Sequence, residues 1–215
     1  MTFDEYLINP ATSLRHIMGL SMGNDLKKRS VVRYGRVAQL FHWVTAILVV
    51  AAFIYGPGGS EQRVYSSARD FDRRLHETLG MCVFALVVLR VLWRMIDVHP
   101  EPPQVPRWMG AAAKTTHYVL YVLLFALPLT AINGAWLEGH PLTLLAGVEI
   151  PPLLALSHEA GATIATVHTW LGDAVLWVAG VHALAALYHH FVLKDRVLAS
   201  MLPRWFPLWR SRSSG

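Results

Sequence analysis

The chain has 215 residues, of which 54% are hydrophobic and only 15% are charged, and its formal net charge is +5. A water-soluble domain of this length rarely has so few charged residues, so the composition argues against a soluble enzyme and indicates a membrane protein. The basic excess does not indicate nucleic-acid binding, because the sequence lacks the aromatic and basic surface that such binding needs. The single cysteine, Cys82, excludes an intramolecular disulfide and a cysteine-ligated cluster.

Four apolar stretches are long enough to cross a bilayer, since a spanning helix needs about 20 residues. They follow a polar N-terminal extension, residues 1–32, for which we expect little core of its own. A proline-rich turn, residues 99–106, separates the second stretch from the third, and an apolar loop, residues 137–166, precedes the fourth. We expect this loop to lie on the membrane surface and cover a site. The predicted spans are Arg36–Tyr55, Leu75–Trp93, Thr115–Trp136 and Val167–Phe191.

The distribution of basic residues predicts the orientation of these spans. With four spans, both termini share one side of the membrane. That side has fourteen Lys and Arg residues, before the first span or at its start, between the second and third spans (Arg94, Arg107 and Lys114) and after the fourth span, whereas the opposite side has only Arg63, Arg69, Arg73 and Arg74. Because cytoplasmic segments are the more basic, we expect both termini to be cytoplasmic. The net positive charge also favours contact with anionic lipid.

His168 and His182 lie fourteen residues apart in the fourth span. At about 100° per residue, fourteen steps return a helix to within about 40° of its starting direction, so both side chains share one face. The rise of about 1.5 Å per residue separates them by about 21 Å along the axis, which places them near opposite sides of the hydrocarbon core. Histidine is costly in lipid and usually faces a functional interior, so this spacing indicates two stacked metal centres.

Depth in the membrane predicts the partners of these two histidines. His76 begins the second span and matches His168 on the outer side, whereas His42 lies in the first span at the depth of His182 on the inner side. Two axial imidazoles from opposed helices are typical of a low-spin haem that only transfers electrons. Zinc would require further ligands, and no carboxylate or thiol lies at these depths.

Two alternatives to this assignment stay open on spacing alone. Any one of the four histidines could instead be a polar helix-packing residue. By depth, His189 and His190 also compete with His182 for the inner site. A functional alternative that needs no haem is a four-helix membrane protein such as a small transporter or scaffold.

Several motifs resemble those of the bacterial cytochrome b561 family. The first span carries RYGRVAQLFHW (33–43), and the second carries His76 followed by VLR (88–90). The third carries HYVLY (117–121) and ALP (126–128). The fourth is the most specific, with His168, GVHALAAL (180–187), HHF (189–191), KD (194–195) and then MLPR (201–204). The resemblance covers residues 33–205, so we expect one membrane domain there, an N-terminal extension over 1–32 and a cytoplasmic tail over 206–215.

The resemblance implies an all-α, four-helix transmembrane bundle in the bacterial inner membrane that holds two haem b groups. It implies that His42 and His182 ligate one haem and that His76 and His168 ligate the other. Compact members of the family resemble the superoxide oxidase, which transfers electrons from superoxide to ubiquinone. Larger relatives are non-catalytic cytochrome b subunits that serve a protein partner, for instance a nickel–iron hydrogenase or a dehydrogenase. We therefore expect either an enzyme of the first kind or an electron-transfer subunit of the second.

Ubiquinone needs two protons as well as two electrons, so a proton donor is expected near the inner haem. His189 lies seven residues after His182 and faces nearly the same way, and His190 and Lys194 are close to it in sequence. The alternative is that these three residues mark the helix end, where cations favour the last carbonyls.

Four further residues are candidates for contact with the cofactors or the donor. Arg90 lies fourteen residues after His76 and is expected to pair with a haem propionate, or else to extend to the cytoplasmic surface. His117 is expected at the entrance of the third span, where it binds a propionate or the quinone, or caps the helix. Arg73 and Arg74 are the nearest cations to the outer haem and are expected to attract the superoxide anion locally. The acidic residues of the outer loops oppose a general positive field on that side.

Overall fold

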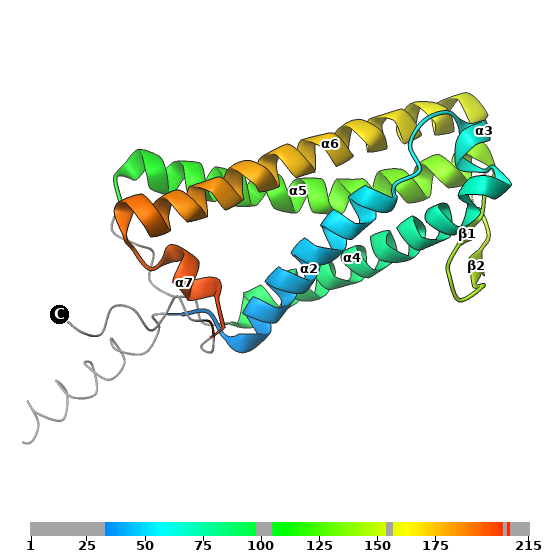
Figure 1. The fold of residues 1–215 in the computed structure, drawn as a ribbon. Helices are drawn as coiled ribbons and strands as arrows, with labels where there is room; N and C mark the ends of the chain where they lie inside the picture. The colour runs from blue at the N-terminus through cyan, green and yellow to red at the C-terminus, as the bar shows by residue number, and fades with distance from the viewer. Residues whose placement is uncertain (1–32, 98–104, 154–156, 204–205, 207–215) are drawn as a thin grey trace, which may run out of the picture.

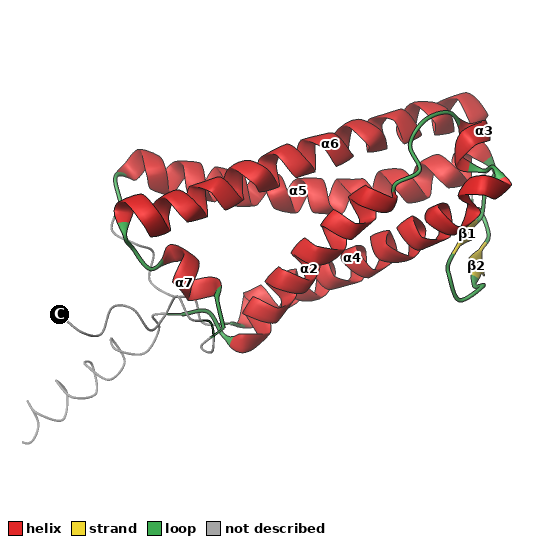
Figure 2. Cartoon of the chain, viewed as in Figure 1, coloured by secondary structure: helices red, strands yellow, loops and turns green. Residues whose placement is uncertain are grey.

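The structure is a computed structural model that describes residues 33–97, 105–153, 157–203 and 206. The predicted N-terminal extension, most of the proline-rich turn and most of the C-terminal tail lie outside the described residues. Four helices are long and apolar enough to cross a membrane, as the sequence predicted. Figure 1 shows them side by side, and Figure 2 shows that loops and the short strands are confined to the ends of the bundle.

The first two long helices are α2 (Arg36–Tyr55) and α4 (Asp70–Ile96). A short helix, α3 (Glu61–Val64), and a 3-10 turn, η1 (Ser67–Arg69), connect them. Asp70 and Asp72 stand in the first turn of α4, where negative charge favours the free amides of a helix start. The bounds of α2 match the predicted span, whereas α4 begins five residues earlier than predicted. The prediction was based on apolar length, and it therefore missed the polar first turn of α4.

The last two long helices are α5 (Arg107–Glu138) and α6 (His158–Tyr188). Both begin well before the predicted spans: α5 starts eight residues earlier and α6 nine. The Ser157 side chain caps α6 by accepting the amide of Ala160 at 3.3 Å, and Gly139 ends α5 with a φ of 86°. A π-helical turn, η2 (His189–Leu193), continues α6, and α7 (Val197–Met201) follows it. The expectation of an outer loop over 137–166 is therefore wrong for its first two residues, which end α5, and for its last nine, which belong to α6.

Two helix pairs make up the bundle: α2 packs along α4, and α5 packs along α6 (Figure 1). The α5–α6 contact depends on glycine. A Cβ atom added at Gly161 would lie 2.7 Å from the Glu138 amide nitrogen and 2.9 Å from the Gly134 carbonyl oxygen. Small residues allow such close backbone approach between membrane helices. The buried core between the pairs is aliphatic and consists of Val83, Val87, Leu123, Leu124 and Val175.

The two ends of the bundle differ, and we name them by their contents. At the hairpin end, β1 (Leu142–Thr143) pairs antiparallel with β2 (Glu149–Ile150), beside α3 and the start of α4. At the α7 end, the α7 segment docks on α2: the Gln39 side-chain amide donates to the Ser200 carbonyl at 3.0 Å, and the Trp43 indole donates to the Met201 carbonyl at 2.9 Å. The hairpin is a small β element within an otherwise helical fold.

The outer surface of the long helices is apolar. Large hydrophobic side chains that are exposed include Leu40, Ile47, Trp108, Trp170 and Trp177. Exposed apolar surface over the whole length of such helices indicates contact with lipid rather than water. The chain is thus a multi-pass membrane protein whose polar residues of interest lie between the helices or at the two ends.

Candidate functional site: two histidine pairs inside the bundle

One histidine pair lies toward the hairpin end. His76 of α4 faces His168 of α6, with ring centroids 6.0 Å apart and ring planes at 86°. Both rings are half-buried. His76 lies six residues into α4 and His168 ten residues into α6, so neither is a helix-terminal residue. The structure therefore brings together the two histidines that depth predicted as the outer pair.

Main-chain carbonyls orient both rings of this pair. The Nδ1 of His76 lies 2.7 Å from the Ala52 carbonyl oxygen, in the last turn of α2, where helix carbonyls lack amide partners. The Nδ1 of His168 lies 2.8 Å from the Leu127 carbonyl oxygen of α5. When Nδ1 donates to a carbonyl, the neutral ring keeps the lone pair of Nε2 for a metal. Each ring is thus oriented as a ligand by a helix other than its own.

A second histidine group lies toward the α7 end. His42 of α2 faces His182 of α6, with ring centroids 6.3 Å apart and planes at 74°. His117 of α5 also approaches His182, at 5.2 Å between centroids. His117 lies ten residues inside α5, so the expectation that it stands at the entrance of the third helix is wrong. His189 and His190, which competed with His182 by depth, lie beyond α6 in the π-helical turn.

The distances between the ring centroids of the paired histidines show whether a haem iron would fit between them. A metal lies about 2 Å from an imidazole nitrogen, so two imidazoles on opposite sides of one iron have ring centroids about 6 Å apart. The His76–His168 and His42–His182 separations both match this value. The His117–His182 centroids are about 1 Å too close for an axial pair. The residues present therefore fit two haems, each of which two histidines would hold, and His117 would lie beside the second of them.

Arg90 lies at the second histidine group. Its Nη2 is 3.3 Å from the Nδ1 of His42, and its guanidinium lies 5.7 Å from the centre of the Tyr121 ring. Arg90 therefore points into the bundle and does not extend to the surface. A half-buried guanidinium held on an aromatic face, with no carboxylate partner among the described residues, is suited to bind an anionic group such as a haem propionate.

At the α7 end, His189 pairs with Asp195. The Nδ1 of His189 contacts the Asp195 carboxylate, whose other oxygen accepts the Val197 amide at 3.0 Å. Lys194 ends the π-helical turn with a φ of 53°, which places Asp195 back against the helix end. The Nδ1 of the half-buried His190 has no hydrogen-bond partner among the described residues. The sequence singled out His189 but did not reveal that Asp195 orients it.

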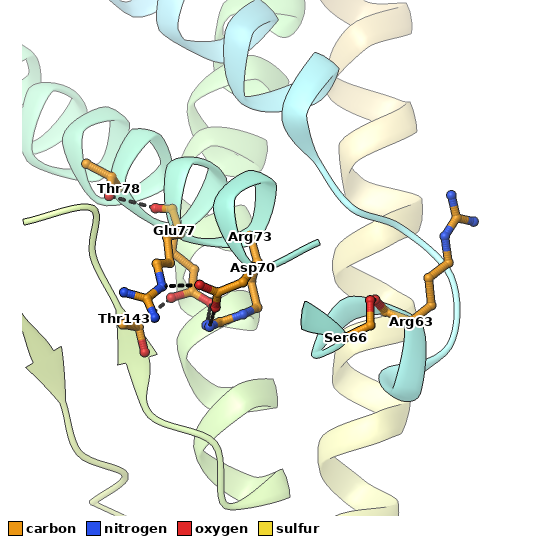
Figure 3. Close-up of polar contacts among 8 residues, drawn as sticks. Arg63, Ser66, Asp70, Arg73, Glu77, Thr78 and Thr143 are labelled. Carbon is orange, nitrogen blue, oxygen red and sulfur yellow. Dashed lines mark hydrogen bonds and ion pairs between the residues drawn. The ribbon is translucent and has the colours of Figure 1, made fainter. Parts of the chain in front are cut away.

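At the hairpin end, the two arginines expected to attract an anion are paired with carboxylates, and Figure 3 shows Arg73 between Asp70 and Glu77. Arg73 is buried and contacts Glu77 at 2.9 Å and Asp70 at 2.7 Å. Arg74 contacts the second oxygen of Asp70 at 2.7 Å. Glu77 in turn accepts the Thr143 amide at 2.5 Å, which ties the hairpin to α4. These arginines thus have a structural contact network beside His76, and their charge is locally compensated.

Arg63 is a different kind of residue. It is exposed in α3, it makes no ion pair with any residue the structure describes, and it points away from the Arg73 network in Figure 3. Arg63 is one of the four outer-side arginines in the sequence, but nearness to His76 along the chain favours Arg73 and Arg74 over it. Arg63 is the more suitable cation at this end for an anion that arrives from water.

Comparison with known proteins identifies the family of the chain. The family model of prokaryotic cytochrome b561 matches residues 33–204. The chain belongs to this family. It is therefore a membrane cytochrome b, a haem b protein of electron transport, and the expected resemblance and helical fold are confirmed.

The chain matches several known proteins over nearly the whole length of each of them. The chain is 32% identical to cytochrome b561 homolog 2 of Escherichia coli K12 over 171 residues, which are 79% of this chain and 91% of that protein. It is 30% identical to the probable superoxide oxidase CybB of Yersinia pestis over 183 residues, 83% of this chain and 97% of that protein. It is 29% identical to cytochrome b562 of Cereibacter sphaeroides over 178 residues, 79% and 94% of the two chains.

Proposed function

We propose that this protein is a diheme cytochrome b of the bacterial inner membrane that oxidises superoxide and reduces ubiquinone. The observation that carries the two-haem part of the proposal is the pair of ring separations, His76–His168 at 6.0 Å and His42–His182 at 6.3 Å, each of which would accommodate one iron between two imidazoles. We place the hairpin end at the periplasm and both termini in the cytoplasm, following the excess of Lys and Arg in the terminal segments.

The four histidines would hold the two haems, and Arg90 would bind a propionate of the one near His42. Bound haem supplies one-electron carriage between the two faces of the membrane. The protein's own contribution is to fix the ligand tautomers, through the Ala52 and Leu127 carbonyls, and to separate the two sites along α6. Fourteen residues of helix place His168 and His182 about 21 Å apart along the axis.

Two superoxide ions lose one electron each and become dioxygen, and one ubiquinone takes both electrons and two protons to become ubiquinol. The printed name of the Yersinia pestis relative supports superoxide as the donor. Exposed Arg63 supports it too, because an unpaired cation at the water-facing end raises the local concentration of a small anion.

The proposed ubiquinone site is at the α7 end, beside His182. The His189–Asp195 pair supports this placement, since a carboxylate that engages Nδ1 leaves Nε2 of the same ring to exchange a proton. His190 and Lys194 are adjacent and would complete a path to cytoplasmic water. His117, close to His182 but at the wrong distance for an axial ligand, is suited to hydrogen-bond a quinone oxygen or a propionate.

A second candidate function is a non-catalytic cytochrome b subunit that receives electrons from a protein partner. The observation in its favour is the compensated charge of Arg69, Arg73 and Arg74, all of which contact carboxylates. A strong general attraction for a small anion is therefore absent from the described part of the hairpin end. A partner protein that delivers electrons at this end would not need such an attraction.

Stopped-flow reduction of the purified chain by superoxide distinguishes the two functions. The proposed enzyme is reduced quickly in the absence of any other protein, and a ubiquinone analogue reoxidises it. Slow reduction by superoxide, together with copurification of a second polypeptide, would reject the enzyme in favour of the subunit. A purified chain without haem would reject both.

A further inference from the structure

A cluster of four potential metal ligands lies at the hairpin end, apart from the two histidine pairs. We call it the Glu–His cluster, and it consists of Glu61, Glu138, His140 and His158. Glu61 begins α3, Glu138 ends α5, His140 follows that helix, and His158 begins α6. Three separate segments of the chain therefore converge on one point.

The ligand atoms of the cluster are already close together. One ligand atom from each of Glu61, Glu138 and His140 lies within 4.8 Å of the other two. One Glu61 oxygen is 2.6 Å from the Nε2 of His140, and the other is 3.2 Å from the Nε2 of His158. Around a tetrahedral zinc ion, adjacent ligand atoms are about 3.3 Å apart, so Glu61, Glu138 and His140 need only small side-chain adjustments to share an ion. His158, which contacts Glu61 but lies outside this group of three, would turn inward to provide the fourth ligand.

The charges of the cluster favour a divalent cation. Glu61 and Glu138 approach each other, and the basic groups that act on both are His140 and His158. The hydrogen bond from His140 holds the pKa of the Glu61 carboxyl below its usual range, so Glu61 is ionised at neutral pH. Two carboxylates this close repel each other, and a divalent cation bound between them would relieve that repulsion.

The backbone holds two of the ligands in place. The His140 amide donates to the Ala135 carbonyl at 2.8 Å, and the His140 ring stacks on Tyr65 with centroids 3.6 Å apart. The Glu138 side chain packs against Gly161, where an added Cβ would lie only 2.6 Å from the Glu138 Cγ. Ligands fixed in this way lose little conformational freedom on binding, which favours affinity.

We propose that the Glu–His cluster binds a divalent transition metal, with Zn²⁺ as the best match, and that the ion fastens α3 to the α5–α6 end of the bundle. Imidazole and carboxylate ligands together are typical of zinc, and four ligands fill its coordination shell. His158 is the most exposed of the four, at 62% of its side chain, so it marks the side from which the ion enters.

The test uses the full-length, haem-loaded protein in detergent, purified with a tag that contains no histidine and stripped with a chelator. Zn²⁺ is titrated against a fluorescent indicator, and haem content is checked by absorbance before and after. We expect one tight site per chain. The variants Glu61→Gln and His140→Ala should each weaken it at least tenfold, and Glu149→Gln, an exposed carboxylate on the adjacent hairpin, should not.

A second measurement keeps the result independent of folding defects. X-ray absorption at the zinc edge should show nitrogen and oxygen ligands with two imidazoles, and Glu61→Gln should retain the wild-type haem spectrum while it loses the zinc site. The proposal is overturned if the wild type binds no zinc, or if Glu61→Gln and His140→Ala bind it as tightly as the wild type. Neither result bears on superoxide oxidation, which is measured separately.

Discussion

His168 is tied to Leu127 across the α5–α6 contact: its Nδ1 lies 2.8 Å from the Leu127 carbonyl oxygen. The same carbonyl accepts the Thr130 hydroxyl at 2.9 Å, and Pro128 follows it directly in α5. Pro128 has no amide hydrogen to donate to the Leu124 carbonyl four residues before it, so the hydrogen-bond ladder of α5 is interrupted in the turn that leads to Leu127. The orientation of a proposed ligand on α6 is therefore set by a main-chain carbonyl of α5.

The first prediction concerns haem content. Replacement of His168 by Ala removes one axial ligand at the hairpin-end site, and His42→Ala does so at the α7-end site. We expect each variant to retain about one low-spin haem per chain, against two in the wild type, because the two sites share no ligand. Pyridine haemochrome analysis gives the ratio.

His117→Ala is the matched control for this experiment. Its ring is too close to His182 to lie on the opposite side of an iron, so both low-spin haems should remain. Loss of a haem from His117→Ala with retention in His42→Ala would show that the axial pair at this end is His117 and His182.

The second prediction concerns the α5–α6 contact. A methyl group at Gly161 meets backbone atoms of α5 at less than 3 Å, so Gly161→Ala must force the two helices apart. We expect destabilisation of about 1–3 kcal/mol, the usual cost of overpacking. The measurement is the midpoint of thermal loss of the haem absorbance. Gly172→Ala, where an added Cβ meets nothing within 4 Å, should leave the midpoint unchanged.

The third prediction concerns anion capture. Arg63→Gln removes an exposed, unpaired cation, so we expect the bimolecular rate of reduction by superoxide to fall roughly threefold at low salt. The difference should shrink as salt is added, because screening acts over about 10 Å at 0.1 M. Arg63→Lys retains the charge and should retain the rate.

Neutralising Arg73 and Arg74 tests whether the two arginines that are paired with carboxylates also contribute to capture of the superoxide anion. Asp70 and Glu77 would lose their partners beside His76, so the effect on the rate would come with a loss of stability. A lower rate without any change in thermal midpoint would contradict the structural role given to this network.

The fourth prediction concerns proton delivery. His189→Ala removes the ring that Asp195 engages, so reoxidation of the reduced cytochrome by a ubiquinone analogue should slow at least tenfold, a modest loss for a general acid. Reduction by an outer donor should not change. Asp195→Asn should have a smaller effect in the same direction, and Tyr188→Phe, an exposed neighbour, should have none. Slower reduction with normal reoxidation would place the quinone site at the other end.

Much of the fold could be predicted because helix period and apolar length are local properties of the sequence. The bounds of α2 were predicted to the residue, whereas α5 and α6 begin eight and nine residues before the apolar windows. Hydropathy marks the lipid-crossing part of a helix and misses polar turns that continue beyond it. Ser157 and Gly139, typical capping residues, carried the information about the true ends.

The residues around the histidines were harder to predict than the histidines themselves. Periodicity places His168 and His182 on one face, but the partners of Nδ1 are main-chain carbonyls, which have no signature in the sequence. The pairing of Arg73 with Glu77 follows from helix spacing and was open to prediction. The pairing of His189 with Asp195 depends on the positive φ of Lys194, which residue spacing does not reveal.

The contribution of α6 to both histidine pairs has a consequence for assembly in the cell. This helix is the last of the four to be synthesised and inserted, and it provides one member of each pair. A nascent chain that has inserted only its first three spans has neither pair complete. Under the proposed ligand set, neither haem could be held by two histidines until α6 is in place, so a chain truncated before residue 158 should retain no low-spin haem.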